Sequence, residues 1–318
     1  MTASAVVTVV AVVVTYHADA AHLMRLLPRL ASQVAHIVCV DNTDAPGDVN
    51  PPAMLTPDAH TTVLRLGHNV GIAHAQNLGI AHARTMSASH VLLMDQDSFP
   101  PPDLVPALLR TMQQPSAQPV AAVGPLCRDV KTGCILPLIQ RHGWRVRRVA
   151  PMTMTEFNVT SHKTSITVEY IPASGSLIDL ALLERVGPLQ ADFFIDRVDV
   201  QWCLRARYLN LAIVVNPAVK MDHDQATRVV RLGTRTLYVG HDFRAYFHVR
   251  NSLAMALRAR IAPFWRIDQL LKLPVYMALH IATAQHGRWS MTGLMIAAVR
   301  DALLCRMGRG HFTDRPLH

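Results

Sequence analysis

The stretch Val91–Asp97, VLLMDQD, decides how the rest of the chain is interpreted. Its apolar residues run directly into Asp95-Gln96-Asp97, and a run of prolines follows shortly after. This pattern predicts a buried strand that carries two carboxylates to its end, after which the chain turns into a loop. Neighbouring carboxylates repel each other unless a cation lies between them, and Mg²⁺ or Mn²⁺ prefers such oxygen ligands. Because these ions commonly hold phosphates, the stretch suggests a nucleotide-phosphate ligand; a plain loop or helix cap is the alternative.

The composition permits a large buried core. The chain has 318 residues and is 50% hydrophobic, which suits one large α/β domain with an appendage. Its 5 cysteines are scattered and form no CxxC pair, so a zinc site or disulfide framework is not expected, and a reducing cytoplasmic location fits. The apolar run at the N-terminus has no basic flank and is too short to cross a bilayer, so a strand is predicted there.

The net charge of +9 is unevenly distributed. Residues 1–243 hold 20 basic and 19 acidic side chains, whereas residues 244–318 hold 11 and 3. The basic segment also contains apolar helical patches, so we expect helices that lie on an anionic membrane surface. Ordinary core helices or a dimer face are the alternative. Nucleic acid is not expected as a partner, because no basic patch interleaved with aromatic residues and no nucleic-acid motif occurs.

Strand and helix patterns alternate before the opening stretch. Val6–Val14 reads as a strand, residues 19–32 as a helix, and His36–Val40 as a second strand that ends at Asp41. Such a unit belongs to a parallel sheet, and ligands gather at the carboxyl ends of its strands. Asp41 is therefore a candidate to accept a hydrogen bond from a base or ribose, with a loop cap as the alternative.

A third predicted strand, Thr61–Leu66, leads into the segment NVGIAHAQNLG, residues 69–79. The pattern after Gly71 is helical, so Asn69 and Gly71 lie at or before a helix N-terminus. Such a terminus offers N–H groups and positive potential to a phosphate. The small residues would also let a backbone or a ligand approach closely. The alternative is a tightly packed helix capped by Asn69.

This order of elements, ending in Asp-x-Asp, resembles family 2 glycosyltransferases of the GT-A fold. The resemblance rests on the strand ending TYH at 15–17, the VDN edge at 40–42, NVGIAHAQNLG at 69–79 and DQDS at 95–98. It implies an α/β, Rossmann-like fold with a mostly parallel sheet flanked by helices. The GT-A domain would cover residues 1–245, and a basic amphipathic helical tail would cover residues 246–318.

The resemblance continues downstream, at FFIDRVD (193–199) and RAYFHVRN (244–251), forms similar to a rhamnosyltransferase branch. It implies that Asp199 is the base that deprotonates the acceptor hydroxyl, with Asp196 as the alternative. Val198 stands where the family commonly has a Glu, which is a departure from its pattern. His223 would join the metal site.

The resemblance also implies a set of ligand contacts. Donor-binding residues would be Thr15, Tyr16, Asp41, Asn69, Gly71, Asn77 and Asp95. Asp95, Asp97 and His223 would hold Mg²⁺ or Mn²⁺.

The implied activity is an inverting transfer from a nucleotide-diphospho-sugar, dTDP-L-rhamnose in this branch, to a hydroxyl of a glycan or lipid-linked acceptor. It would serve cell-surface polysaccharide or glycolipid synthesis, in the cytoplasm or peripherally on the inner face of the cytoplasmic membrane. A sugar nucleotidyltransferase of related fold is one alternative, but it would carry a Gly-rich, Arg-containing loop where this chain has TYHADAAH. The other is a non-enzymatic basic membrane-surface protein, against which the motif order argues.

Overall fold

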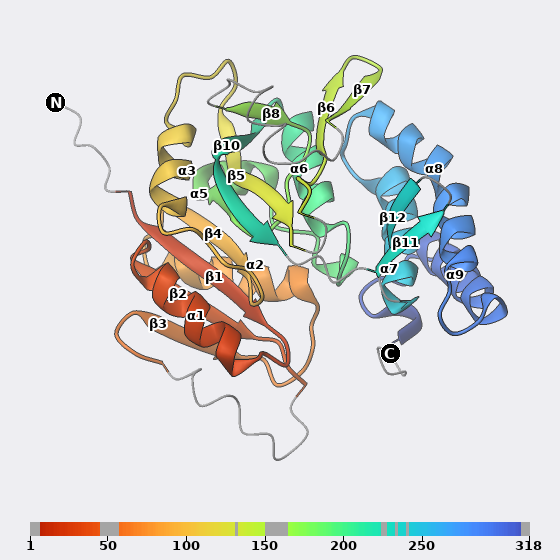
Figure 1. Ribbon diagram of the computed structural model, residues 1–318, viewed down its shortest axis with the longest axis horizontal. Coiled ribbons are helices and arrows are strands. Elements are labelled where there is room, and N and C mark those ends of the chain that lie inside the picture. The colour runs from red at the N-terminus through yellow and green to blue at the C-terminus, as the bar shows by residue number, and fades with distance from the viewer. Residues whose placement is uncertain are drawn as a thin grey trace.

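The computed structural model describes residues 7–44, 57–130, 133–149, 165–223, 228–232, 235–239 and 242–312. For residues 149, 223, 228–232 and 235–239 it describes the backbone alone. Its main sheet has 8 strands in the order β3-β2-β1-β4-β9-β5-β10-β8 (Figure 1).

The strands of this sheet are β1 (Val9–Thr15), β2 (His36–Asp41), β3 (Thr61–Arg65), β4 (His90–Asp95), β5 (Val120–Asp129), β8 (Ile166–Val168), β9 (Ser176–Asp179) and β10 (Ala212–His223). β3, β2, β1 and β4 pair in parallel, as do β5 and β10. β9 runs antiparallel to both β4 and β5, and β8 runs antiparallel to β10. The expectation of a mostly parallel sheet is therefore confirmed.

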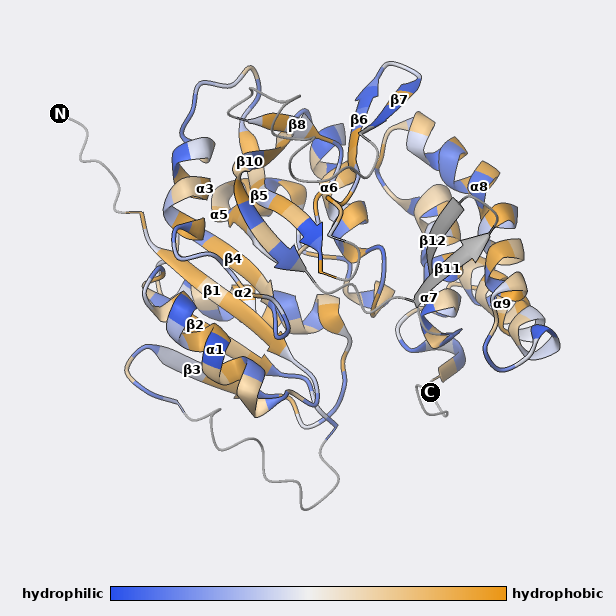
Figure 2. Cartoon of the chain, in the orientation of Figure 1, coloured by the Kyte–Doolittle hydropathy of each residue, from blue (hydrophilic) through white to orange (hydrophobic). Residues whose placement is uncertain are grey.

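Helices cover both faces of the sheet. They are α1 (Ala20–Ala31), α2 (Ile72–Thr85), α3 (Leu104–Met112), α5 (Leu180–Val186) and α6 (Val198–Tyr208), with a short 3₁₀ turn, η1, at Ala191–Phe193. Every residue of β1 is buried: Val9, Ala11 and Val13 belong to an apolar cluster with residues of α1 and α3, and Val10, Val12 and Val14 belong to another with residues of α2 and α6. A strand buried on both faces needs apolar residues throughout, which explains the run in the sequence (Figure 2).

β10 is longer than the sequence indicates. Asn216-Pro217 interrupts the strand pattern after Val215, and the pairing with β5 shifts register there and resumes at Lys220. Proline cannot donate to a ladder and is tolerated at such an irregularity. The strand therefore continues to His223, and it reaches the edge where the carboxylates lie.

Two hairpins and three helices complete the described chain. The hairpins are β6 (Leu138–His142) with β7 (Arg145–Val149), and β11 (Arg228–Leu232) with β12 (Arg235–Val239). The helices are α7 (Asp242–Arg258), α8 (Pro263–Ala282) and α9 (Arg288–Leu303), followed by η2 (Gly310–Phe312). The expected boundary between residues 245 and 246 falls inside α7. Within the described ranges, no helix has both the length and the apolar character that crossing a membrane requires.

α7 holds a strained turn that precedes α6. Phe194, Asp196 and Arg197 of this turn have φ values of 65°, 69° and 63°, which non-glycine residues rarely adopt. The side-chain nitrogen of Asn251, Nδ2, donates to the carbonyl oxygens of Phe193, Ile195 and Asp196 at 3.0, 2.9 and 2.9 Å. Such conformations persist only where the surrounding structure enforces them, and Asn251 supplies that constraint.

Arg250 reinforces the same contact. Its Nη2 donates to the carbonyl of Phe193 at 2.9 Å, its Nη1 donates to the carbonyl of Gly308 at 2.6 Å, and the guanidinium lies 4.9 Å from the centre of the Phe247 ring. Arg250 and Asn251 are both fully buried. Below, Asn251 and Arg250 together are called the α7 clamp.

Asn251→Ala should lower the free energy of unfolding by about 1–3 kcal/mol, because the carbonyls of Ile195 and Asp196 lose their side-chain donor. Urea unfolding measures this change. Ser252→Ala is the matched control: Ser252 is equally buried, and its hydroxyl has no partner in the described part of the chain. Its loss should be neutral or stabilising. Equal losses in the two variants would contradict the role of the clamp.

Candidate active site at the carboxyl edge of the sheet

Strand register brings the first predicted site residues together. Thr15 pairs with Asp41 across β1 and β2, and Val14 pairs with Asp95 across β1 and β4. The Thr15 hydroxyl is fully buried and donates to Oδ1 of Asp41 at 3.5 Å. That oxygen also accepts from the backbone of Thr43 at 3.2 Å, so Asp41 does cap a loop, as the alternative proposed. Its Oδ2 has no partner among the described residues.

Gln96 orients the two carboxylates. Its Oε1 accepts from the Tyr16 N–H at 2.7 Å, and its Nε2 donates to the Tyr16 carbonyl at 3.0 Å. The backbone of Asp95 donates to the Ser174 hydroxyl at 3.0 Å, and Ser174 in turn bonds Ser98 at 2.7 Å in a buried pair. The middle residue of Asp-Gln-Asp therefore fixes the loop to β1. The sequence did not predict that Gln96 and Ser174 hold this loop, because Gln and Ser form hydrogen bonds in many settings and no motif marks them here.

Asp97 is half-buried and makes no hydrogen bond or ion pair with any described residue. The loop that follows it lies beside the end of β10, because Phe99 and Asp222 form an antiparallel bridge. Asp222 is engaged by Arg128 through two bonds of 2.8 Å and is not available as a ligand. His223, next along β10, has its side chain outside the described part of the structure, so its metal role stays a prediction.

The carboxylates suit a divalent cation in their chemistry. Among the described side chains, no group of three His, Cys, Asp or Glu is arranged to hold a metal. Mg²⁺ does not need such a group, since it is usually bound through one or two carboxylates together with water and substrate phosphates. Asp97, which forms no other polar contact in the described chain, and Asp95 beside it fit that donor set.

Side chains hold the loop that leads into α2. The N–H groups of Asn69, Val70 and Gly71 donate to side-chain oxygens of Asp44, Asn42 and Asn69 at 2.8, 2.8 and 2.9 Å. These N–H groups precede the helix, and its N-cap residue, Gly71, forms no side-chain cap, so the phosphate site expected at this terminus stays a prediction.

Close packing also requires a glycine at position 71. It has φ of 85°, and a Cβ there would lie 2.6–2.7 Å from atoms of Phe194. The close approach that the small residues predicted is made here by Phe194, through its backbone and its ring. Asn77 likewise has a protein partner: it bonds the backbone of Leu189 in both directions, at 2.8 and 3.0 Å. Sequence reasoning missed that this amide ties α2 to the segment before η1.

The two candidate bases differ in their surroundings. Asp199 lies in the first turn of α6, accepts from the Val200 N–H at 2.7 Å, and lines an apolar cavity of about 10 Å³. That volume holds at most one water molecule. Burial raises the pKa of Asp199, and the hydrogen bond from Val200 does not cancel this rise.

Asp196 is surrounded by arginine and histidine side chains. Its Oδ2 is 3.9 Å from Nε of Arg244. Burial alone would raise the pKa of Asp196, but the surrounding groups outweigh burial and lower it. These groups are His248, Arg244 and Arg197. A general base near neutral pH benefits from a raised pKa, so the environment favours Asp199.

Known proteins with similar sequences are glycosyltransferases. The sequence matches glycosyl transferase family 2 over residues 10–168. It is 27% identical over 304 residues to dTDP-rhamnosyl transferase RfbF of Shigella flexneri, and the alignment covers 95% of this chain and 97% of RfbF.

Solved structures share the fold. S. aureus TarS 1–349 in complex with UDP-GlcNAc has a TM-score of 0.51 and 16% identity, over 93% of this chain and 80% of that one. GalNAc-T7 with UDP, GalNAc and Mn²⁺ has a TM-score of 0.52 and 13% identity, over 89% of this chain; this chain spans 58% of its length. At such low sequence identity these similarities are evidence for the fold only. The expected GT-A architecture is confirmed.

The family match covers half of the chain, and within it lie β1, β2 and β4, which present Thr15, Asp41 and Asp95 at one edge. An Asp-x-Asp loop held by Gln96 stands at the same edge, and an aspartate with a raised pKa opens α6. The chain belongs to glycosyl transferase family 2, and it is an enzyme of that class.

Proposed function

We propose that this enzyme transfers L-rhamnose from dTDP-L-rhamnose, with inversion, to a hydroxyl of a glycan or lipid-linked acceptor in cell-surface polysaccharide or glycolipid synthesis. The observation that carries the proposal is the similarity to RfbF, which runs along 95% of the chain and is not confined to the sheet. The FFIDRVD and RAYFHVRN segments support it, since the α7 clamp joins them physically.

The donor would lie across the carboxyl edge of the sheet. Thr15, Tyr16 and Asp41 would contact its base and ribose, and Asp95 would face the ribose or the metal. Mg²⁺ or Mn²⁺, bound to Asp97 and Asp95 with His223, would neutralise the charge that builds on the departing diphosphate. Asn69, Gly71 and Asn77 would shape the pocket wall through the contacts that they make with the protein.

Asp199 would act on the acceptor. Its carboxylate removes the proton of the attacking hydroxyl while that oxygen bonds the anomeric carbon and the bond to the diphosphate breaks. A single displacement from the opposite face inverts the anomeric centre and needs no covalent enzyme intermediate. The membrane and cytoplasmic location expected from the sequence belongs to this proposal as well.

A panel of nucleotide-sugars tests the donor. With Mn²⁺ present, calorimetry should detect tighter binding of dTDP-L-rhamnose than of UDP-GlcNAc, UDP-galactose or dTDP alone. The dTDP control separates recognition of the sugar from recognition of the nucleotide. Equal binding of dTDP-L-rhamnose and the UDP-sugars would refute the donor assignment while leaving glycosyl transfer intact.

Asp97→Ala should abolish donor turnover that depends on Mg²⁺ or Mn²⁺, because it removes the carboxylate best placed to hold the ion. The fold should survive, since Asp97 makes no hydrogen bond to any described residue. Asp103→Ala is the control, as Asp103 is an exposed acid in the next loop whose side chain caps nothing. Donor hydrolysis and transfer are measured across a metal titration; an unchanged response in Asp97→Ala would end the metal role.

Asp199→Asn should reduce kcat by roughly 10²–10⁴, the usual size of general-base catalysis, and leave donor binding unchanged. Asp196→Asn is the matched comparison and should lose less. Because the pKa of Asp199 is raised, the acid limb of the wild-type pH profile should lie above the ordinary aspartate value of about 3.9, and transfer should fail as the pH drops below it. A large loss in Asp196→Asn alone would move the role to Asp196.

A further inference from the structure

α8 exposes its apolar side. The exposed residues at helical spacing are Pro263, Ile267, Leu270, Leu271, Pro274, Val275 and Ala278. Leu271 and Val275 are 71% and 63% exposed. They recur at intervals of three and four residues, so they form one stripe along the outer face of the helix.

The inner face of α8 carries both apolar and polar groups: Leu273, Tyr276 and Met277 pack against the cluster formed by α7 and α9, beside buried polar side chains. Gln269 and His280 are buried, and the indole nitrogen of the buried Trp265 donates to Glu169 at 2.7 Å. A surface helix of a soluble protein normally has a single apolar side, turned inward, so the second apolar face of α8 is unusual. The one acid of α8, Asp268, has a mostly buried side chain that is paired with Lys272 at 2.8 Å. The outer stripe therefore carries no unpaired carboxylate.

The β6–β7 hairpin extends this surface. Its turn exposes Trp144 at 70%, together with Arg145, Arg147 and Arg148. In the described chain none of these three arginines forms an ion pair. The Trp144 ring lies 5.7 Å from the ring of Phe264, in the first turn of α8. The arginine-rich hairpin and the apolar stripe are thus neighbours, although they are far apart in the sequence.

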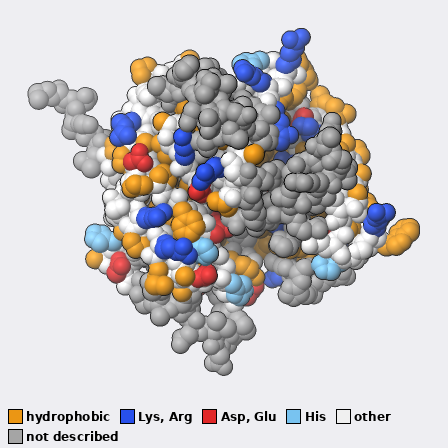
Figure 3. Space-filling model, in the orientation of Figure 1, with side chains coloured by type: hydrophobic (Ala, Val, Ile, Leu, Met, Phe, Trp, Pro, Cys, Tyr) orange, Lys and Arg blue, Asp and Glu red, His pale blue; other side chains and the backbone are white. Residues whose placement is uncertain are grey.

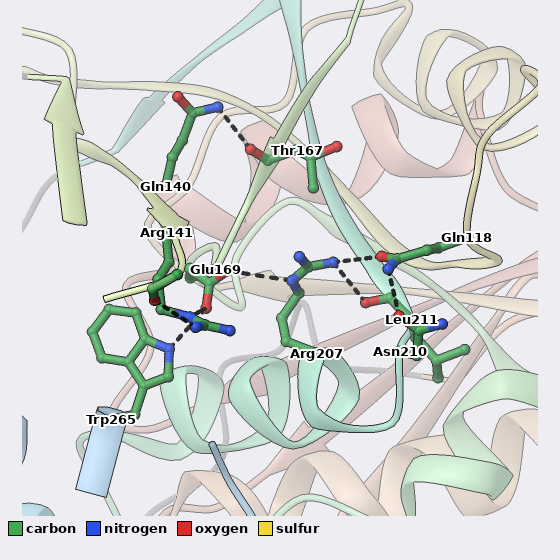
Figure 4. A network of polar contacts seen from close by, with 10 residues as sticks. Gln118, Gln140, Arg141, Thr167, Glu169, Arg207, Asn210, Leu211 and Trp265 are labelled. Atoms are coloured by element: carbon green, nitrogen blue, oxygen red, sulfur yellow. Dashed lines mark hydrogen bonds and ion pairs between the residues drawn. The ribbon is translucent and has the colours of Figure 1, made fainter. Parts of the chain in front are cut away.

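A buried carboxylate fixes the two parts to each other. Glu169 accepts from Trp265 of α8, from Arg141 of β6 at 3.4 Å and from Arg207 of α6 at 3.5 Å (Figure 4). Arg141 also lies 5.8 Å from the centre of the Phe264 ring. Because these contacts are buried, they hold the hairpin and α8 in a fixed arrangement.

We propose that the outer stripe of α8 and the β6–β7 hairpin form one surface that docks on a bilayer containing anionic lipid. The stripe would enter the boundary between headgroups and acyl chains, Trp144 would lie at the interface, and the hairpin arginines would contact lipid phosphates. Charge complementarity favours a lipid surface over a protein groove. In Figure 3, basic side chains stand over the hairpin at the top of the molecule and hydrophobic ones follow along its right-hand edge.

α8 contacts the turn before α6 through its inner side. The Arg197 guanidinium is 5.4 Å from the centre of the Tyr276 ring on α8, and Arg197 is the residue that precedes α6. The docking itself does not depend on which sugar is transferred.

The test is flotation of the purified full-length protein with vesicles of phosphatidylcholine, with and without phosphatidylglycerol. The wild type should float with the anionic vesicles and less so at high salt. Leu271→Glu/Val275→Glu should weaken binding at least about tenfold, as burial of two such side chains is lost. Arg145→Ala/Arg147→Ala should weaken it roughly fivefold for each arginine, at low salt only.

Met24→Glu is the matched control, since Met24 is 50% exposed on α1, at the other end of the molecule. It should bind like the wild type. Light scattering and turnover of a soluble acceptor accompany each variant, so that loss of docking is distinguished from loss of transfer. Wild-type binding by Leu271→Glu/Val275→Glu would overturn the proposal. So would an equal loss in Met24→Glu, or a dimer that becomes a monomer in the double variant, which would make the stripe a dimer face.

Discussion

The turn at residues 193–197 depends on a few buried hydrogen bonds from α7. Asn251 and Arg250 reach its carbonyl groups, and without these donors three residues with positive φ would relax. Phe194 of this turn packs against Gly71 at the start of α2, on the proposed donor side. Arg197 of the same turn precedes α6, which carries Asp199. The proposed donor pocket and the proposed base are therefore positioned by one strained loop, and a residue of the expected tail controls both.

Local patterns predicted much of this fold. Apolar runs marked β1, β2 and β4 because strands buried on both faces have no polar positions, and the polar residues that ended them marked the functional edge. Interactions between distant segments were not predictable in the same way. The continuation of β10 past Pro217 depends on β5, and the antiparallel course of β9 depends on the gap between β4 and β5.

In the candidate site, too, local features were predictable from the sequence and contacts between distant segments were not. The positions of Asp95 and Asp97 followed from the sequence, because a strand end is a local feature. The difference between Asp196 and Asp199 did not, since it arises from Arg244 and His248 on a helix that comes much later. Nor could spacing reveal that the N–H groups near Gly71 are already bonded, because their acceptors, Asn42 and Asp44, follow another strand. The sequence therefore predicted which residues belong to the site, whereas contacts with distant segments determine their pKa values and hydrogen bonds.

The basic character of the C-terminal segment illustrates why a charge count is an incomplete guide. Arg250 is buried against carbonyl groups, Arg258 donates to the end of α9, and Arg266 donates to carbonyls at the end of α7 at 2.7 and 2.9 Å. Arg258 and Arg266 thus bond the ends of helices and Arg250 bonds buried carbonyls, so part of the positive charge of the tail has a structural role. Arg260, Arg288 and Arg306 of the tail are exposed, and the exposed arginines that neighbour the α8 stripe lie on the β6–β7 hairpin, outside the expected tail. Attraction to a membrane would then come from one part of the chain and apolar insertion from another, and Glu169 is the group that makes the two act together.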